Sequence, residues 1–333
     1  MNNHLSAIDR CRICGNHLDA EDQFCSNCGT EAPLDNTENA NSKNSLLKQT
    51  ASVYSFRCND CGAAMSYDAS AQSLRCPFCG SLSMTRKPDT RVLRPEGIVP
   101  FLVPHEAAVK LCQDWIHEGF WRPSDIRERS MIEAIAAVYV PYWVFSAATE
   151  THWTADSSAV PAGSRGNWCP VAGDHRNQYT GLLVGGSTAL TPAETSNIAP
   201  FDLNKAVLPE EIDLTNVRVE EFQMPRKQAR PLAVGSLQEL ERQACRKYVR
   251  GESRNLRVNV RISNMSSHPI LLPIWIMAYR YKNQVYRVLI NGQTGKLSGG
   301  APFAYGKLAA IITTIVIVVL LIALAVFFMS RIR

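Results

Sequence analysis

The sequence predicts an α+β protein made of two small zinc ribbons, one larger α+β domain and a C-terminal transmembrane helix. Three observations predict this class. Eight of the eleven cysteines fall into four Cys-x-x-Cys pairs. Helix-like and strand-like periodicities alternate between residues 98 and 305. The stretch 308–329 contains no charged residue. The hydrophobic content of 46% is that of a globular protein rather than a disordered chain.

Each predicted ribbon, residues 1–29 and residues 54–82, contains two Cys-x-x-Cys turns. Two such turns supply four thiolates, which complete a tetrahedral structural Zn²⁺ site and leave no position open for a catalytic water. A glycine follows the second cysteine of every turn, where a positive φ lets backbone N–H groups face the sulfurs. We therefore predict two structural Zn²⁺ ions. The predicted ligands are Cys11, Cys14, Cys25 and Cys28 in ribbon one, and Cys58, Cys61, Cys76 and Cys79 in ribbon two.

The net charge and the cysteine pattern restrict the binding partners and the cellular compartment of the protein. Eight thiolates and two Zn²⁺ ions together add −4 to the formal charge of +5, which leaves +1 and no global attraction to nucleic acid or anionic lipid. Thiolate sites need a reducing compartment, and the N-terminal stretch has no apolar core of a signal peptide. Residues 30–53 are predicted to form a flexible linker, and residues 83–97 are predicted to form a basic linker.

The larger α+β domain, residues 98–305, contains a predicted internal repeat. Pro-x-Trp occurs inside an apolar strand at Pro141 and again at Pro273, an offset of 132 residues, and helical patterns start near Pro104 and Ser236 at the same offset. We expect two halves, each a helix followed by a sheet, with each proline at a strand start or edge. The second helix should bury a stripe of four residues. These are Leu237, Leu240, Ala244 and Tyr248.

Two further expectations concern this domain. After Trp275 the sequence alternates apolar and polar residues on both sides of 282–284, which predicts a hairpin. Residues 150–235 are rich in Gly, Pro, Thr and Val, which predicts irregular β structure.

Residues 308–329 predict a transmembrane helix. At 1.5 Å per residue they span roughly 33 Å, enough to cross a hydrocarbon core about 30 Å thick. Positive charges flank the span equally, so the compartment of the thiolates decides the orientation. We expect a single-pass protein of the cytoplasmic (inner) membrane, with the N-terminal domains in the cytosol, the lipid bilayer around 308–329 and a short tail at 330–333.

Signatures of catalysis are weak. The sequence has no phosphate-binding glycine loop, His-Glu-x-x-His motif or Gly-x-Ser-x-Gly motif. The stretch around Cys169, with Asp174 and His175, offers the only nominees for a nucleophile and its base. We expect a protein that is not an enzyme.

The tandem ribbons, the strand around Pro141, the segment from Leu271 to Gly299 and the terminal span together resemble a bacterial family of zinc-ribbon membrane proteins with a transcription-factor-IIB-type ribbon. The resemblance implies an association with phage-shock or SPFH membrane-stress proteins, and hence an adaptor that recruits protein partners at the cytoplasmic membrane face. The alternative function is a membrane-tethered nucleic-acid binder that uses ribbon two and the basic stretch 86–94. Neither ribbon offers the interleaved basic and aromatic residues of a phosphate-binding face, which disfavours that alternative.

Overall fold

The computed structural model describes residues 11, 53–68, 75–86, 93, 95–117, 123, 131–132, 135–214, 217–281 and 284–331. The helices of this part of the chain are α1 (His105–His117), α3 (Pro192–Ile198), α4 (Arg226–Arg246), α5 (Tyr305–Arg331) and the short 3₁₀ helices η2 (Leu203–Lys205) and η3 (Pro209–Glu211). The strands are β1 (Val53–Cys58), β2 (Ala64–Asp68), β3 (Met84–Arg86), β4 (Gly97–Ile98), β5 (Met131–Ile132), β6 (Ala136–Ser157), β7 (Cys169–Gly185), β8 (Arg218–Glu220), β9 (Ser253–Tyr281), β10 (Gln284–Asn291) and β11 (Leu297–Gly299).

These strands form one 11-stranded sheet around the antiparallel pair β6 and β9. The main path runs β11-β10-β9-β6-β8-β2-β1-β3, with β4 and β5 also on β9 and β7 also on β6. The β4–β9 and β6–β8 pairings are parallel, and the others are antiparallel. The expectation of a fold that combines helices with β-sheet is confirmed, although the described strands form one large sheet that also includes β1–β3 of the second ribbon. The predicted hairpin is also present, because β9 and β10 pair from Tyr281 and Gln284 onward.

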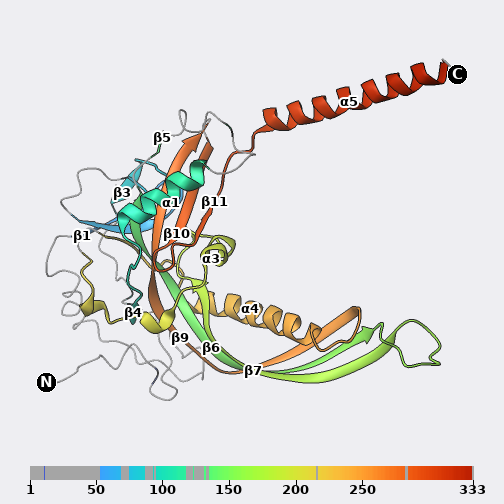
Figure 1. The fold of residues 1–333 in the computed structure, drawn as a ribbon. Coiled ribbons are helices and arrows are strands. Elements are labelled where there is room, and N and C mark those ends of the chain that lie inside the picture. Colours follow the sequence, from blue (N-terminus) through green and yellow to red (C-terminus); the bar gives the residue numbers. More distant parts are fainter. Residues whose placement is uncertain are drawn as a thin grey trace.

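The two faces of the β6–β9 pair are covered differently (Figure 1). Side chains alternate between the faces. Trp143 and Trp275 lie on the face that α1 and α4 cover. The opposite face carries Val140 and Leu272, and it packs against the cysteine-bearing segment β1–β3 and the region around Ile198. The main core is therefore shared between the larger domain and the second Cys-x-x-Cys segment.

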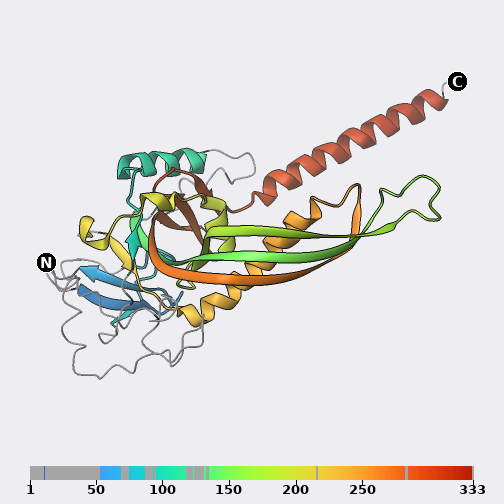
Figure 2. The same cartoon turned by 90° about the horizontal axis from the view of Figure 1, so that it is seen from below.

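Beyond a bulge between Phe145 and Ala147, the strands β6, β7 and β9 continue away from this body as a three-stranded arm with α4 along one face (Figures 1 and 2). We define the arm as residues 147–180 and 237–265. Its inner face buries Trp153 and Ala155 of β6 against Cys245 of α4 and Val249. The opposite face of the arm is polar and exposed.

The two Pro-x-Trp segments have matching surroundings. Pro141 O accepts a hydrogen bond from Gly186 N (2.8 Å), and Pro273 O accepts one from Gly292 N (2.9 Å). Each indole N–H donates, over 2.9 Å, to the carbonyl two residues before a helix: Trp143 to Met224 before α4, and Trp275 to Val103 before α1.

The strand registers match as well. The parallel pairs Ile98↔Leu271 and Val219↔Tyr139 correspond, and Val140 pairs directly with Leu272 at the centre. The helices that correspond begin at 105 and 226, 121 residues apart, so the expected helical offset of 132 is wrong. The repeat itself stays a prediction that these equivalences support.

The expectation that Pro141 and Pro273 mark a strand edge or start is wrong, because both lie inside the two central strands. The N–H and C=O of a strand residue point to the same side, and both proline carbonyls point away from the β6–β9 interface, to Gly186 and Gly292. On that side, the neighbour of β6 changes from β8 to β7 at this point, and the neighbour of β9 changes from β4 to β10. The missing N–H therefore faces a break in the ladder, where it interrupts no strand pairing.

Two other expectations for the larger domain differ from the structure. Residues 150–185 belong mainly to the long regular strands β6 and β7, rather than to irregular β structure. Helix α4 begins at Arg226, ten residues before Ser236, although Pro231 lies inside it. Its buried stripe contains Leu237 but not Leu240 or Tyr248, which are exposed. The stripe runs along Arg226, Ala229, Ala233, Leu237, Glu241 and Cys245.

Helix α5 projects from the body at the C-terminal end (Figures 1 and 2). An 18-residue stretch within Tyr305–Leu324 has a mean hydropathy of 2.8, and none of that stretch is buried in the molecule. It is the one described helix long and apolar enough to span a membrane. An apolar helix exposed on all sides is not the core helix of a soluble domain.

Candidate metal centre

Four predicted ligands come together in the second Cys-x-x-Cys segment. The donor atoms of Cys58, Cys61, Cys76 and Cys79 all lie within 4.8 Å of one another. The Sγ atoms of Cys58 and Cys79 are 3.6 Å apart, and those of Cys61 and Cys76 are 3.5 Å apart. Tetrahedral coordination with Zn–S bonds of about 2.3 Å requires sulfur separations of about 3.8 Å. The group therefore has the separations of a four-thiolate metal site.

The two turns that carry these cysteines have the same backbone structure. Cys58 N donates to Ala63 O and Gly62 N to Cys58 O. In the second turn, Cys76 N donates to Ser81 O and Gly80 N to Cys76 O, with all four distances between 2.8 and 3.0 Å. Gly62 and Gly80 have φ of 78° and 73°. Only glycine adopts this conformation without strain, which explains why it follows the second cysteine of each turn.

Hydrogen bonds between the thiols make them electrostatically unequal. Hydrogen bonds to Cys76 and Cys79 lower the pKa of Cys61 to about 4. The same hydrogen bond to Cys61 raises the pKa of Cys76. The cluster therefore favours one thiolate that its neighbours stabilise. A divalent cation would be needed to hold all four sulfurs deprotonated so close together.

The centre is built into the larger domain. Cys58, Cys76 and Phe78 are nearly fully buried and belong to the core cluster of β6 and β9. Strand β2 pairs with β8 through Met65↔Glu220. A sequence pattern of Cys pairs identifies the ligands, but it contains no information about this strand pairing.

Ribbon one is described only at Cys11, which is buried. The other predicted ligands of that ribbon, Cys14, Cys25 and Cys28, lie outside the described residues. The first Zn²⁺ therefore stays a prediction.

A second cluster, which the sequence did not predict, surrounds Glu241 of α4. Its fully buried carboxylate accepts hydrogen bonds from Thr149 Oγ1 and Thr151 Oγ1 at 2.7 Å, and His175 Nδ1 lies 2.8 Å from Oε2. Burial raises the pKa of Glu241, but hydrogen bonds from Thr151, His175 and Thr149 outweigh it, so the pKa is lowered overall. Cys245 completes a group within metal-binding distance. Because three donors already satisfy the carboxylate, we interpret the cluster as a buried hydrogen-bond network.

The nominees for catalysis are not brought together. Cys169 and His175 lie on the same strand, β7, opposite Ser157 and Thr151 of β6. Six residues of strand separate them by about 20 Å. The Cys169 thiol lies 3.5 Å from Ala159 O, and Asp174 contacts His152. This geometry excludes a direct Cys169–His175 pair in this conformation.

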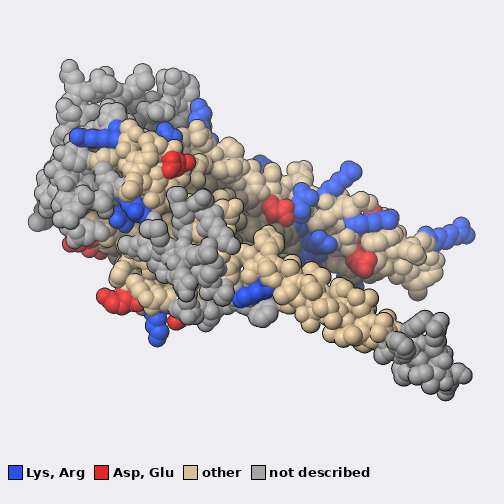
Figure 3. Space-filling view, turned by 90° about the horizontal axis from the view of Figure 1, so that it is seen from above, with Lys and Arg blue, Asp and Glu red and all other residues tan. Residues whose placement is uncertain are grey.

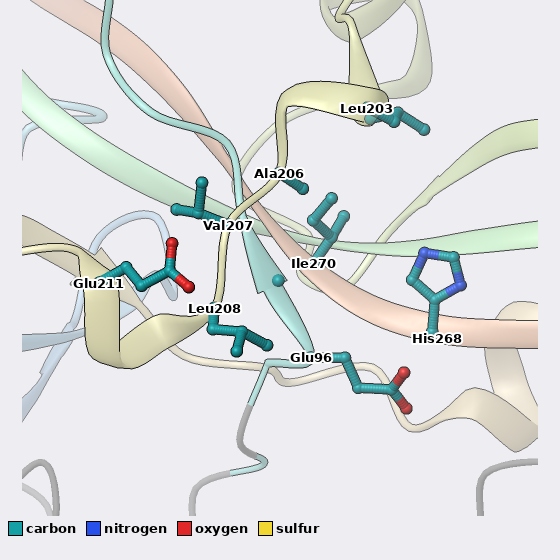
Figure 4. Close-up of a pocket in the computed structure, with 9 residues that line it drawn as sticks. Glu96, Leu203, Ala206, Val207, Leu208, Glu211, His268 and Ile270 are labelled. Carbon is teal, nitrogen blue, oxygen red and sulfur yellow. The ribbon is translucent and has the colours of Figure 1, made fainter.

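A shallow hollow of about 410 Å³ lies between β4, β9 and the segment that carries η2 and η3 (Figure 4). Its floor is apolar, from residues such as Val207 and Ile270, while Glu96 and His268 lie at one end and Glu211 at the other. Its charged groups do not converge on one point, so the hollow has no arrangement for acid–base chemistry.

Comparisons with known proteins give limited information. No family model matches the chain, and no solved structure matches it. An uncharacterised protein of Bacillus subtilis (strain 168), YdjG, is 22% identical over 227 residues, which is 66% of this chain and 67% of that protein. Its name assigns no activity, so the similarity transfers none.

Proposed function

We propose that this protein is a membrane-anchored, zinc-binding adaptor that recruits protein partners at the cytoplasmic membrane face, and that it has no catalytic activity of its own. The observation that carries this proposal is the four-cysteine group at metal-binding distances in a chain that also has an exposed apolar helix of membrane-spanning length. The family resemblance in the sequence is the reason for proposing phage-shock or SPFH-type proteins as the partners.

The four described ligands fit Zn²⁺ by their chemistry. Four cysteine sulfurs, two of them fully buried, suit a soft or borderline cation and leave no open coordination position. Bound there, Zn²⁺ would supply folding energy to a segment whose three strands are short. A second Zn²⁺ in ribbon one is proposed on sequence spacing alone.

The second ribbon also offers a contact surface. Leu82 is 65% exposed just beyond the second Cys-x-x-Cys turn of this ribbon, and Asn59 and Asp60 are exposed within the first turn. Asn59 is held by Ser83 Oγ and Thr85 Oγ1, each 2.9 Å away, so this surface has a fixed shape. A rigid small surface with one large apolar side chain suits recognition of another protein better than of a polyanion.

The test is affinity purification of the full-length protein from detergent-solubilised membranes, comparing wild type with Leu82→Asp and with Cys61→Ser. Zinc is measured in each preparation. We expect Leu82→Asp to keep its zinc and lose partner proteins, and Cys61→Ser to lose both. Cys169→Ser is the matched control, because that thiol lies far from the cluster, and it should keep both.

Two outcomes would contradict the proposal. One is an identical set of co-purified proteins from wild type and both ribbon variants. The other is recovery of nucleic acid instead of protein, lost in the same variants, which would favour the nucleic-acid alternative. The compartment follows from protease treatment of sealed vesicles, where the N-terminal domains should be digested only from the cytosolic side.

A further inference from the structure

The strongest concentration of charge lies on the arm. Residues 242–261, from the end of α4 into β9, contain seven basic residues and one acidic residue, Glu252. The net charge of this segment, +6, exceeds the formal +5 of the whole chain. All seven basic side chains belong to exposed residues: Arg242, Arg246, Lys247, Arg250, Arg254, Arg257 and Arg261.

Few of these basic side chains form ion pairs with acidic residues of the same molecule. Arg242 lies 3.5 Å from Glu239, and Arg254 lies 3.2 Å from Asp156. The other five make no ion pair with an acidic residue in the described part of the chain. Cations near a helix C-terminus interact favourably with its dipole, which accounts for Arg246 and Lys247. That effect does not reach Arg250, Arg257 or Arg261.

Aromatic side chains accompany the basic ones at the same end of the arm. Trp168 lies 4.3 Å below the guanidinium of Arg254, and Tyr248 is 60% exposed between Lys247 and Val249. Tryptophan and tyrosine beside lysine and arginine are typical of surfaces at the level of lipid headgroups.

The arm and α5 leave the body on the same side of the molecule (Figures 1 and 2). Figure 3 shows basic side chains spread over the arm on that side, with the apolar α5 extending beside it. A helix that spans the bilayer holds the rest of the chain close to it, so even weak attraction to the surface becomes effective. Burial of charged side chains in the hydrocarbon core of a bilayer is costly, so we expect the charged strands of the arm to lie in the headgroup layer.

We infer that the basic segment 242–261 docks on the anionic headgroups of the membrane in which α5 is anchored. This inference rests on the membrane anchoring proposed above. Nucleic acid shares the phosphate chemistry but not the proximity, and it is a separate outcome of the test. Docking of the arm would fix the orientation of the domain, and with it that of the zinc centre, relative to the bilayer.

The test uses the full-length protein in nanodiscs of phosphatidylcholine alone or with 30% phosphatidylglycerol. Amide hydrogen exchange is followed at residues 247–252, the segment between α4 and β9 that carries the exposed side chains of Lys247 and Arg250. We expect exchange there to slow about tenfold in the anionic discs only, and 0.5 M salt to remove the difference, because a surface contact of this kind is screened.

A triple variant isolates the charges. Arg246→Gln, Lys247→Gln and Arg250→Gln together should abolish the slowing. The matched control, Arg57→Gln, Lys110→Gln and Lys205→Gln, removes three exposed charges elsewhere and should keep it. Equal exchange of the wild type in neutral and anionic discs would overturn the inference.

Two other results have distinct meanings. Slowing by an added oligonucleotide in neutral discs, without any effect of anionic lipid, would assign the surface to nucleic acid and overturn lipid docking. Failure of the chain to remain in either disc after an alkaline wash would refute the anchoring proposal itself, and lipid docking with it.

Discussion

Glu220 is an unusual residue at the end of β8. It is 1% exposed, and neither carboxylate oxygen has a hydrogen-bond partner in the described part of the structure. Burial raises its pKa from 4.5 to about 8, and the positive charge of Arg287 offsets only part of this increase. The native state therefore binds more protons than the unfolded state between these pH values, and the free energy of unfolding falls as pH rises through that window.

We predict that Glu220→Gln removes this pH dependence. Between pH 6 and pH 9 the wild type should lose about 2–3 kcal/mol of stability relative to the variant, with most of the loss complete by pH 8. Denaturant unfolding of the detergent-solubilised protein at a series of pH values measures this difference. Glu252→Gln, on an exposed turn, is the control and should follow the wild type. Parallel pH profiles of wild type and Glu220→Gln would refute the assignment.

Glu241 differs from Glu220 because its buried carboxylate is hydrogen-bonded, which lowers its pKa. Glu241→Ala leaves Thr149, Thr151 and His175 without their common acceptor, and it should lower the free energy of unfolding by about 3 kcal/mol. Glu239→Ala, two residues earlier on the exposed side of α4, should change it by less than about 0.5 kcal/mol. Thermal unfolding of both variants gives the comparison, and equal costs would show that the network contributes nothing.

At the scale of elements, two glycines occupy equivalent tight positions beside the central prolines. A Cβ on Gly186 would lie 2.7 Å from the Phe222 ring and 3.0 Å from Pro141 O. A Cβ on Gly292 would lie 2.6 Å from the Phe101 ring and 2.9 Å from Pro273 Cβ. Both approaches are shorter than van der Waals contact, so neither site tolerates a side chain without moving the segment that leads into α4 or α1.

Gly186→Ala and Gly292→Ala should therefore each destabilise the domain by about 2 kcal/mol, and by similar amounts. Gly235→Ala provides the contrast, because nothing lies within 4 Å of its Cβ position in α4, and it should stabilise by roughly 0.5–1 kcal/mol. Unfolding midpoints of the three variants test this. A large cost at one of the two tight glycines and none at the other would argue against equivalent halves.

The two Cys-x-x-Cys turns lead to a prediction about the stability of β1–β3. Loss of one ligand should release one Zn²⁺ per chain and also lower the unfolding midpoint of the whole domain, because Met65 and Phe78 belong to the main core. Cys58→Ser measured by zinc content and by intrinsic fluorescence tests both effects. Zinc loss with an unchanged midpoint would mean that the two turns fold independently of the sheet.

These elements show what the sequence alone could predict. The two Cys-x-x-Cys-Gly turns at Cys58 and Cys76, the helix at 105–117 and the β9–β10 hairpin depend on local chemistry and were predictable. The β2–β8 pairing and the place of Pro141 depend on contacts between segments distant in the chain. The buried stripe of α4 was missed because it contains Arg226 and Glu241, whose partners come from elsewhere in the fold.

At the scale of the whole molecule, one sheet connects the metal centre to the arm. β2 lies between the two Cys-x-x-Cys turns in the chain and pairs with β8, β8 pairs with β6, and β6 runs into the arm. If a partner binds at the four-cysteine segment and the arm lies on a bilayer, as proposed above, one continuous hydrogen-bonded sheet connects the two sites. The bulges between Phe145 and Ala147 and between Ser146 and Ala148 are where this sheet bends.

The role of α5 is the remaining prediction at this scale. Arginine near the centre of a transmembrane helix costs about 2.5–3.5 kcal/mol per residue, so Val318→Arg with Leu321→Arg should prevent stable insertion. Both positions are exposed on α5, and substitution there disturbs no packing in the body. Alkaline extraction of membranes should release the double arginine variant and retain both the wild type and the control, Val318→Leu with Leu321→Ile.

The zinc content of the released variant distinguishes anchoring from folding. Because the metal ligands belong to the body and α5 projects from it, we expect the released protein to keep its zinc and its unfolding midpoint. Retention of the double arginine variant after alkaline extraction would refute the role of α5 as the membrane anchor, because this treatment releases proteins that only surface charge holds to the bilayer.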